Sequence, residues 1–415
     1  MTASASGQRR PLKVLTVAET FFHDHRNGLA RVAWDVCCGL ARRGHEVTLV
    51  APAPVSAIED QVTDGVRVVR FPQPQISGFN PWNPSRRIDA YAHGLEEFGA
   101  LSWDAVHCHG IYGATAAARV VRRRGRLIVT AHSPVLDEQR WNWLHGPSRD
   151  RIKLLGLPML RRIEAEALGA ADVCTSLSAF TRDRICELYP LLAHKRWCVI
   201  PHWVGMTWRR SLTVREARER LGWNPDEKVV LAVRQLRSRY GLDTAIKAMA
   251  VIAKQEKSRL RIVGQGELRA DLERLVTRLN LHGCVSFEGG LPDADLRLCY
   301  QAADVCVVPS RALECFGVPV IESLGFGVPV VATAVGGLRE ILGQLTPQLV
   351  VPPDDAAALA KTVLSILRGT AQVPPGNVML EYVQERFSEE SLVRMYEQAL
   401  DPCGGPHASA TAARH

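Results

Sequence analysis

The chain has 415 residues, 47% of them hydrophobic and 23% charged, which is ordinary material for two globular domains. Its net charge of +8 and its pI near 9.0 suit an anionic ligand or a weak association with anionic lipid. Nucleic acid is ranked low as a partner, because the basic residues are scattered and no nucleic-acid-binding module is recognisable. No apolar run reaches the roughly 18–20 residues needed to span a bilayer.

The cysteines and the two chain ends predict a cytoplasmic protein. The 11 cysteines are odd in number, lie mostly inside apolar runs and form no C-x-x-C pair, which is typical of reduced thiols that fill a core. Residues 1–11 lack the apolar segment of a signal peptide, so we expect a flexible tail there. The Gly-, Ala- and Ser-rich residues 402–415 are expected to be disordered.

In the first half of the chain, short β-branched runs alternate with amphipathic stretches, the pattern of parallel sheets with crossover helices. The expected strands are 13–18, 47–51, 66–71, 105–108, 127–130, 173–176 and 197–200. The expected helices are 29–43, 115–124, 152–168 and 179–188.

The pattern breaks near residue 205, and a second series of the same kind follows. Its expected strands are 228–233, 259–263, 285–287, 305–308, 328–332 and 349–351, and its expected helices are 242–253, 268–279, 293–302, 317–325 and 356–367. The sequence therefore predicts two doubly wound α/β domains, 12–205 and 206–385, and a helix over 386–401 that packs back toward the first. Ligands of such sheets bind at the carboxyl ends of the strands, so we expect the site between the domains.

The segment from residue 308 to residue 340 is the most informative part of the chain. Glu314 and Glu322 lie eight positions apart on either side of a glycine-containing turn that follows a strand and opens a helix. Either carboxylate alone is an ordinary polar helix residue. Together, they can accept hydrogen bonds on both sides of an anion held at the helix N-terminus. A diphosphate that carries a sugar at each end has this shape, which predicts a nucleotide-sugar site.

This string resembles the E-x7-E segment of retaining GT-B glycosyltransferases, in particular glycosyltransferase family 4. The resemblance implies an α/β GT-B fold of two Rossmann-like, doubly wound parallel-sheet domains that face a central cleft. It implies metal-independent, retaining transfer of a sugar from a UDP- or GDP-type sugar, with no further cofactor. The acceptor hydroxyl would belong to a saccharide, a lipid-linked precursor or a small natural product, and the oligomeric state stays open.

The resemblance also assigns roles at the turn. Glu314 would hold hydroxyls of the donor sugar, Glu322 would hold the ribose, and the turn would hold the diphosphate. The turn residues are Cys315, Phe316, Gly317 and Val318. A cysteine at a helix N-terminus suggests a stabilised thiolate or a residue that offers only its backbone N–H, and we favour the second interpretation.

Two loops upstream complete the expected donor site. Gly264 and Gly266 follow a strand and open a helix, and they match the V-G-x-G segment that lines the nucleotide pocket in the family. Residues 231–249 stand where the family usually carries G-R-L-x-x-x-K-G, with Gln235 and Tyr240 at the Arg and Lys positions.

Arginines flank these two departures from the family pattern. They are interpreted either as solvated loop charges or as catalytic residues that neutralise the leaving diphosphate. We favour the second interpretation for Arg234 and Arg239, because an uncompensated diphosphate between two domains is costly.

The loop after the first strand reads FHDHRNGLAR, and it resembles the family's G-G loop. Gly28 is expected to approach the donor, and Asn27 replaces the first glycine because Asn tolerates positive φ. His23 and Asp24 are predicted to touch the acceptor. A metal site is rejected, because neighbouring side chains rarely point at one ion.

Histidines close two strands of the first half. His109 is expected at the reacting centre, as in the family, rather than as a loop-packing residue. His132, in a T-x-H segment, is a second acceptor-side candidate. Four tryptophans are expected in loops, either against acceptor or as buried anchors: Trp141, Trp143, Trp203 and Trp208. Asp293 and Asp295 are read as helix caps rather than as a D-x-D metal motif.

Residues 152–162, IKLLGLPMLRR, are basic and apolar. They are interpreted as a packed helix, which Pro158 and the shortness of the run favour, or as a weak peripheral contact with the cytosolic face of a membrane. An NAD-type oxidoreductase would need G-x-G-x-x-G after the first strand, which the turn after Ala18 lacks. A non-catalytic nucleotide-sugar-binding relative stays as the alternative, because of Gln235 and Tyr240.

Overall fold

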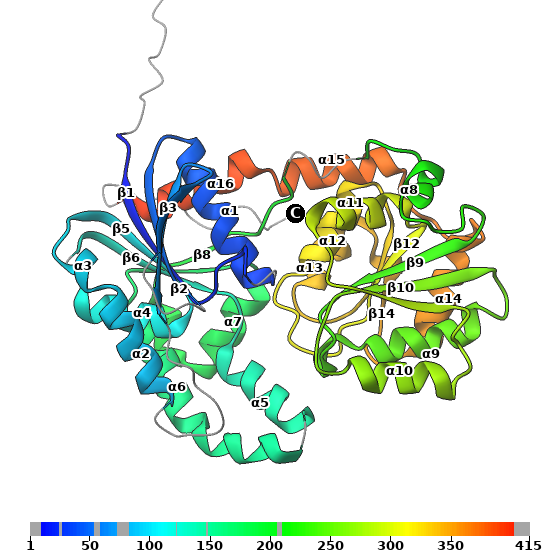
Figure 1. Cartoon of the computed structure of the whole chain (residues 1–415), viewed down its shortest axis with the longest axis horizontal. Helices are drawn as coiled ribbons and strands as arrows, with labels where there is room; N and C mark the ends of the chain where they lie inside the picture. Colours follow the sequence, from blue (N-terminus) through cyan, green and yellow to red (C-terminus); the bar gives the residue numbers. More distant parts are fainter. Residues whose placement is uncertain are drawn as a thin grey trace, which may run out of the picture.

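The computed structural model describes residues 10–401 except 25–26, 54–58, 73–82, 122, 147 and 206–209. Two α/β domains lie side by side, each with a central sheet between helices (Figure 1). The expected tails at 1–11 and 402–415, the hinge near residue 205 and Trp208 lie wholly or in large part outside the described residues.

The N-terminal domain is built on an eight-stranded sheet in the order β3-β4-β2-β1-β5-β6-β7-β8. Its strands are β1 (Lys13–Ala18), β2 (Glu46–Ala53), β3 (Glu59–Thr63), β4 (Val66–Pro72), β5 (Trp103–His109), β6 (Arg123–Ala131), β7 (Val173–Ser176) and β8 (Trp197–Val199). Its helices are α1 (Gly28–Arg42), α2 (Asn83–Gly94), α3 (Glu96–Gly99), α4 (Ile111–Val120), α5 (Val135–His145), α6 (Leu157–Ala170) and α7 (Ala179–Leu188), with 3-10 turns η1 (Ser148–Gly156) and η2 (Pro190–His194).

The C-terminal domain has a six-stranded sheet in the order β11-β10-β9-β12-β13-β14. Its strands are β9 (Lys228–Val233), β10 (Ser258–Val263), β11 (Val285–Gly289), β12 (Val305–Val308), β13 (Val330–Thr333) and β14 (Val350–Val351). Its helices are α8 (Val214–Arg220), α9 (Leu242–Ile252), α10 (Arg269–Arg278), α11 (Asp293–Ala302), α12 (Val318–Gly325), α13 (Leu338–Leu345) and α14 (Ala356–Leu367), with 3-10 turns η3 (Ser238–Tyr240) and η4 (Pro347–Leu349).

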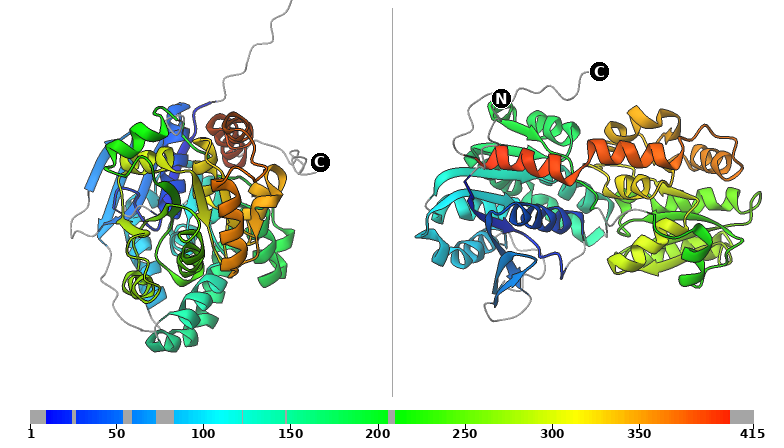
Figure 2. Two further views of the ribbon diagram at one scale, coloured as in Figure 1. Left: turned by 90° about the vertical axis from the view of Figure 1, so that its right-hand side faces the viewer. Right: turned by 90° about the horizontal axis from the view of Figure 1, so that it is seen from above.

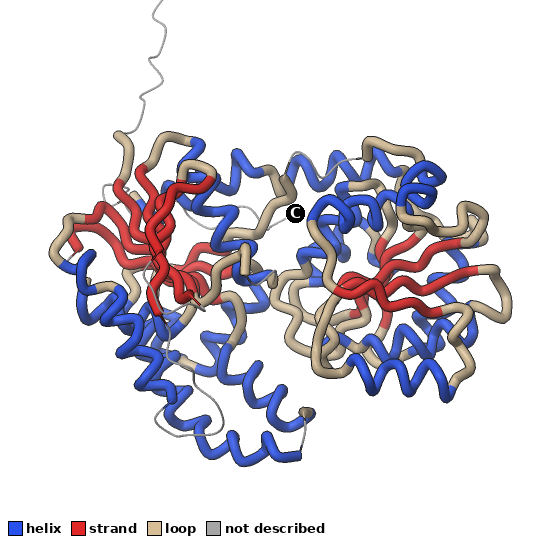
Figure 3. Tube along the Cα trace, viewed as in Figure 1, coloured by secondary structure: helices blue, strands red, loops and turns tan. Residues whose placement is uncertain are grey.

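Both sheets are of the predicted doubly wound kind. In each domain the first strands are added on one side of the initial strand, and the later strands are added on its other side. Ligands bind at such switch points, which here lie between β1 and β5 and between β9 and β12. Loops of the two domains face one another between the sheets (Figure 3). The fold therefore brings the carboxyl ends of the two central strand pairs toward a shared region.

The last two helices connect the domains. α15 (Gly376–Arg386) lies along the C-terminal domain, and α16 (Glu389–Leu400) continues onto the N-terminal domain (Figure 2). Gly39 of α1 permits the close approach of α16, because a Cβ there would lie 2.6 Å from a methyl carbon of Val393. The buried Glu397 carboxylate is bonded to His45 Nε2 (2.9 Å) and Arg43 Nε (2.5 Å) on the N-terminal domain.

Several elements differ from the sequence prediction. The N-terminal sheet is not wholly parallel, because the unpredicted strand β3 pairs antiparallel with β4. The helix expected over 152–168 begins only at Leu157, where Pro158 occupies the first turn, and a 3-10 segment precedes it. The helix expected over 115–124 is α4, which begins and ends four residues earlier because β6 begins at Arg123. Helices α2, α3, α5, α8, α13 and α15 were not predicted. Trp141 and Trp143 therefore lie on α5 and not in a loop, whereas Trp203 is a buried anchor against Tyr396.

Among the described residues, no helix is long and apolar enough to cross a bilayer.

Candidate active site between the domains

The loops after β9 and β12 meet at the switch point of the C-terminal domain. Arg234 follows β9 and Glu314 follows β12, and both side chains are more than nine-tenths buried. Arg234 Nη2 lies 2.9 Å from Glu314 Oε2, and the Ser310 hydroxyl donates to the same oxygen at 2.7 Å. Within the part of the chain that the structure describes, Arg234 Nε and Nη2 nevertheless have no aligned hydrogen-bond acceptor. A buried guanidinium with unused N–H groups is suited to an anionic ligand.

Glycines allow the neighbouring loops to pack against Arg234. Gly264 has φ +140°, and a Cβ there would lie 1.9 Å from the Arg234 carbonyl oxygen. A Cβ on Gly266 would lie 2.5 Å from the Leu236 carbonyl oxygen. Both predicted donor-loop glycines are therefore required by close backbone approach, which fixes the path of the loop that carries Arg234.

The turn before α12 has the predicted glycine conformation. Gly317 has φ +105° and caps the helix. Pro319 supplies no N–H, and the Val320 amide already donates to the Gly317 carbonyl at 2.8 Å. The amides of Gly317 and Val318 are therefore the ones suited to a ligand at this turn, fewer than a helix N-terminus usually offers. Phe316 is buried in the core, and burial raises the pKa of the Cys315 thiol to about 12, so it is not a thiolate.

Glu322 is a buried residue of α12, the helix that follows this turn. The Tyr300 hydroxyl donates to Glu322 Oε2 at 2.8 Å. Burial raises the pKa of Glu322, and the attraction of Arg31 and the Tyr300 bond offset only part of that effect. Arg31 comes from α1 of the other domain and also pairs with Asp293 at 2.8 Å. The carboxylate expected at the ribose therefore lies where the two domains meet.

Tyr240 stands at the position of the family's lysine, and it organises the two arginines. Its ring centroid is 5.2 Å from the Arg234 guanidinium carbon and 4.7 Å from that of Arg239. Arg239 Nη2 donates to the Tyr240 hydroxyl at 2.8 Å and lies 2.9 Å from Glu138 Oε1 on α5. Burial would lower the pKa of Arg239, but Tyr240 and Glu138 outweigh it and raise that pKa.

The N-terminal domain contributes a pair of histidines. His109 ends β5 and is fully buried, with Nδ1 2.9 Å from His132 Nε2. His109 Nε2 has no hydrogen-bond partner in the described structure. Burial lowers the pKa of His132 to about 3 and holds that of His109 well below its usual value, so both rings are neutral at pH 7.

The loop after β1 differs from the expectation in its details. Asn27 has φ −115° and caps α1 by accepting the Ala30 N–H at 2.9 Å, so it is a helix cap and not a positive-φ residue. Among the described residues, no atom lies within 4 Å of a Cβ built on Gly28. His23 packs beside Trp34 and stays exposed, and Asp24 is paired with Arg70.

Trp141, predicted to touch the acceptor, and Glu138 both lie on helix α5. The buried carboxylate of Glu164 accepts the first amides of α5, those of Val135 (2.7 Å) and Leu136 (3.0 Å). It therefore caps the helix from a different element. The Trp141 ring stacks on His145 with 3.9 Å between centroids, and its Nε1 has no partner.

The two domains are also joined at the N-terminus of α7. The amides of Ala179 and Phe180 donate to the Glu340 carboxylate at 3.0 and 2.7 Å, and the Ser178 hydroxyl donates to the Cys315 carbonyl. The turn that contains Cys315 and Gly317 thus contacts the N-terminal domain directly.

Asp293 and Asp295 lie in the first turn of α11, but neither caps it, because Pro292 is the N-cap and no side chain bonds there. Within the described residues, no group of three or more His, Cys, Asp or Glu side chains is arranged to hold a metal ion.

Comparison with known proteins identifies the family. Residues 213–378 match the model of glycosyl transferases group 1, and residues 26–207 match that of glycosyltransferase family 4. Mannosylfructose-phosphate synthase from Agrobacterium fabrum is 34% identical over 330 residues, which cover 74% of this chain and 70% of that enzyme. The chain belongs to glycosyltransferase family 4. It is a glycosyltransferase that moves a sugar from a nucleotide sugar.

Solved structures confirm the predicted GT-B architecture of this glycosyltransferase. Sucrose-phosphate synthase from Thermosynechococcus elongatus aligns with a TM-score of 0.75 at 23% identity, over 93% of this chain and 98% of that one. Anabaena Alr3699/HepE, solved in complex with UDP and glucose, aligns with a TM-score of 0.71 at 17% identity, over 94% and 99%. At these identities the likeness shows the fold alone.

Sequence reasoning missed several residues at this site of the glycosyltransferase. Glu138 and Ser178 carry no motif, and their role depends on partners in the other domain. Arg31 stands inside the quoted FHDHRNGLAR string, but only its contact with Asp293 distinguishes it. Tyr240 was noted as a departure from the family, and its place between two arginines is visible only in the structure.

Proposed function

We propose that this glycosyltransferase is a retaining, metal-independent enzyme that uses a UDP- or GDP-type sugar. The observation that carries the proposal is the buried Arg234, whose Nε and Nη2 lack aligned acceptors beside Glu314. A leaving diphosphate would accept hydrogen bonds from these two nitrogens and would also balance the positive charge of the Arg234 guanidinium. The Arg239 guanidinium also lies beside the Tyr240 ring, with 4.7 Å between its carbon and the ring centroid, and adds a second positive charge. HepE was solved in complex with UDP and glucose, so a uridine nucleotide is the first donor type that we would test.

In this proposal the anomeric C–O bond loosens first, and charge accumulates on the diphosphate. Arg234, Arg239 and the amide of Val318 stabilise that charge, each by about 1–4 kcal/mol in a water-poor site. Glu314 holds the donor-sugar hydroxyls and Glu322 holds the ribose. The acceptor hydroxyl attacks from the face of the departing phosphate, which takes its proton.

The acceptor is assigned to the N-terminal domain, and its class is a hydroxyl of a saccharide, lipid precursor or small natural product. His109 Nε2 and Trp141 Nε1 are buried polar atoms without partners, and both lie on this side. His132 orients His109 through their 2.9 Å contact. Asp24 is a weaker candidate, because Arg70 occupies its carboxylate.

A panel of UDP-, GDP-, ADP- and dTDP-glucose, scored by thermal shift, tests the donor assignment, since a bound ligand raises apparent stability. Transfer or hydrolysis of the stabilising donor separates an enzyme from the alternative, a non-catalytic binder of the same fold. The anomeric configuration of the product, read by NMR, tests retention. Unchanged turnover after treatment with EDTA tests metal independence, and failure of all four donors to bind would overturn the proposal.

A weak contact with the cytosolic face of a membrane is part of the same proposal. Exposed apolar side chains gather at η1 and the end of α5: Leu155 is 75% exposed, Ile152 54% and Leu144 39%. Between residues 140 and 162 the chain has six Arg or Lys residues and one acidic residue. This combination suits anionic lipid. Co-sedimentation with phosphatidylglycerol vesicles but not with phosphatidylcholine vesicles, lost in Leu155→Ser, is the expected result.

A further inference from the structure

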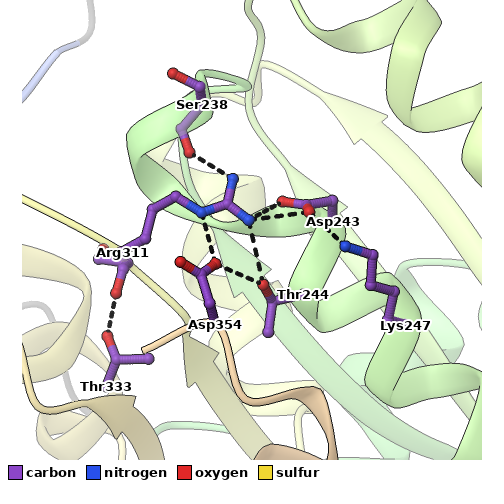
Figure 4. Close-up of polar contacts among 8 residues, drawn as sticks. Ser238, Asp243, Thr244, Lys247, Arg311, Thr333 and Asp354 are labelled. Carbon is purple, nitrogen blue, oxygen red and sulfur yellow. Dashed lines mark hydrogen bonds and ion pairs between the residues drawn. The ribbon is translucent and has the colours of Figure 1, made fainter. Parts of the chain in front are cut away.

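Arg311 lies three residues before Glu314, and its side chain is enclosed by polar groups from other segments of the C-terminal domain (Figure 4). Its Nη2 donates to both carboxylate oxygens of Asp243 (2.8 and 2.9 Å), and its Nε donates to Asp354 at 2.7 Å. Its Nη1 donates to the Ser238 carbonyl at 3.0 Å. The guanidinium is therefore occupied by protein groups and is not a ligand-binding group itself.

Two of these partners, Ser238 and Asp243, lie just after Arg234 and next to Arg239, the two arginines of the proposed donor site, whereas Asp354 precedes α14. The turn η3 spans only Ser238–Tyr240, and it precedes α9, whose first turn contains Asp243. Arg311 donates hydrogen bonds to two of the three carbonyls of η3. Its guanidinium bonds the Ser238 carbonyl, and its backbone amide donates to the Arg239 carbonyl at 2.8 Å. Gly241, at φ +62°, completes the contact, because a Cβ there would lie 2.0 Å from the Pro309 carbonyl oxygen.

We propose that Arg311 is a positioning residue for donor binding: it clamps η3 to the Glu314 loop, so that Arg239 and Tyr240 are held in place to meet the diphosphate. This inference rests on the proposed donor site. A long arginine side chain loses rotamer entropy when it binds, and a fixed backbone beneath it reduces that cost. The clamp thus links the loops after β9 and β12 at the switch point.

The charges around Arg311 are consistent with a rigid clamp. Burial alone would raise the pKa of Asp243, but the hydrogen bonds from Arg311 and Lys247 outweigh it and lower that pKa. The Thr244 hydroxyl lies 3.4 Å from both Arg311 Nη2 and Asp354 Oδ1. Asp354 itself has φ +58°, a conformation that Asn also adopts, so Asp354→Asn removes one charge without straining the backbone.

Arg259 provides a matched control. Its side chain is 26% exposed, against 21% for Arg311, and it pairs with Glu227 at 2.8 Å. It lies at the amino-terminal end of β10, away from the donor loops. Loss of Arg259 therefore removes a comparable ion pair but leaves η3 untouched.

The experiment compares wild type, Arg311→Ala, Arg311→Lys, Asp354→Asn and Arg259→Ala by calorimetric binding of UDP and UMP. GDP and GMP, or ADP and AMP, replace them if the donor panel selects another base. We expect Arg311→Ala to weaken diphosphate binding about tenfold more than monophosphate binding. Arg311→Lys and Asp354→Asn should lower the ratio of diphosphate affinity to monophosphate affinity in the same direction but by less. Arg259→Ala should keep the wild-type ratio.

A purely structural role would lower the melting temperature of Arg311→Ala and Arg259→Ala alike, without changing the ratio. That result overturns the inference. If Arg311→Ala does not fold, Arg311→Lys and Asp354→Asn decide, and a wild-type ratio in both overturns it equally. A wild type that binds none of these diphosphates overturns the proposed donor site itself, and this inference with it.

Discussion

Replacement of Arg234 by Met tests the donor site most directly. The substitution keeps a long side chain but removes the guanidinium that lies 2.9 Å from the Glu314 carboxylate. Both residues are more than nine-tenths buried, so the change leaves a buried Glu314 carboxylate that keeps the Ser310 hydrogen bond but has lost its ion-pair partner. Stability and donor recognition should therefore both fall, for different reasons.

The two losses can be estimated separately. Removing one partner of a buried ion pair typically costs about 3–5 kcal/mol of stability. We expect a loss near the lower end of this range, because the Ser310 hydroxyl still donates a hydrogen bond to the remaining Glu314 carboxylate. Arg234 has two N–H groups without aligned acceptors. Charge-assisted bonds contribute about 1.5–3 kcal/mol each. Loss of two such bonds predicts a decrease of at least about 3 kcal/mol in transition-state stabilisation, or at least about a hundredfold in kcat/KM.

The assay is a double-mutant cycle of Arg234→Met and Glu314→Gln, measured by denaturant unfolding and by steady-state transfer from the donor that the panel selects. Glu314→Gln removes the unpaired charge, so the double variant should recover most of the stability but not kcat/KM. Arg261→Met is the matched control, because Arg261 forms another Arg–Glu pair at 2.9 Å, with Glu288. A kcat/KM for Arg234→Met within threefold of wild type would refute the reasoning.

Three further outcomes are expected. Glu322→Ala should weaken donor binding about tenfold by calorimetry while the acceptor KM stays unchanged, and an unchanged donor affinity removes the ribose contact. Gly264→Ala should lower the unfolding free energy by roughly 3 kcal/mol or more, because its Cβ would lie 1.9 Å from the Arg234 carbonyl oxygen; an unchanged melting temperature contradicts this. The free energy of unfolding should decrease as the pH falls below 6.5, because His109 and His132 gain protons there only in the unfolded chain. Each histidine should contribute a slope that approaches about 1.4 kcal/mol per pH unit. A flat profile in urea unfolding from pH 7 to pH 5, or an equal slope in His132→Gln, refutes the assignment of buried neutral rings.

The sheets could be predicted because their strands are nearly continuous apolar runs. β1 and β12 are buried along almost their whole length, and the sequence shows them as β-branched segments bounded by turn residues. β3 was missed because Glu59–Thr63 is polar and has no buried residue. α5 was missed for a related reason: none of its residues is fully buried, although Val135, Leu136 and Trp143 pack partly against the core, and the distant Glu164 carboxylate accepts its first amides.

The donor turn could be predicted in more detail than the loop after β1. Gly317 and Gly264 need positive φ and close approach, and these requirements leave a local pattern in the sequence. The sequence predicts positive φ for Asn27 by analogy with a glycine. In the structure its φ is −115°, and its side chain caps α1. The analogy failed because Asn serves both conformations equally well, and the sequence does not distinguish them.

The contacts that join the domains leave no local pattern at all. Arg31 and Asp293 are 262 residues apart, Ala179 and Glu340 are 161 apart, and Ser178 is 137 residues from Cys315. Each contact sets the position of a donor-side group relative to the N-terminal domain. The proposed donor site therefore lies on loops of one sheet, which a motif can encode. Placement of an acceptor against that donor follows from interdomain polar contacts, which only the folded chain brings together.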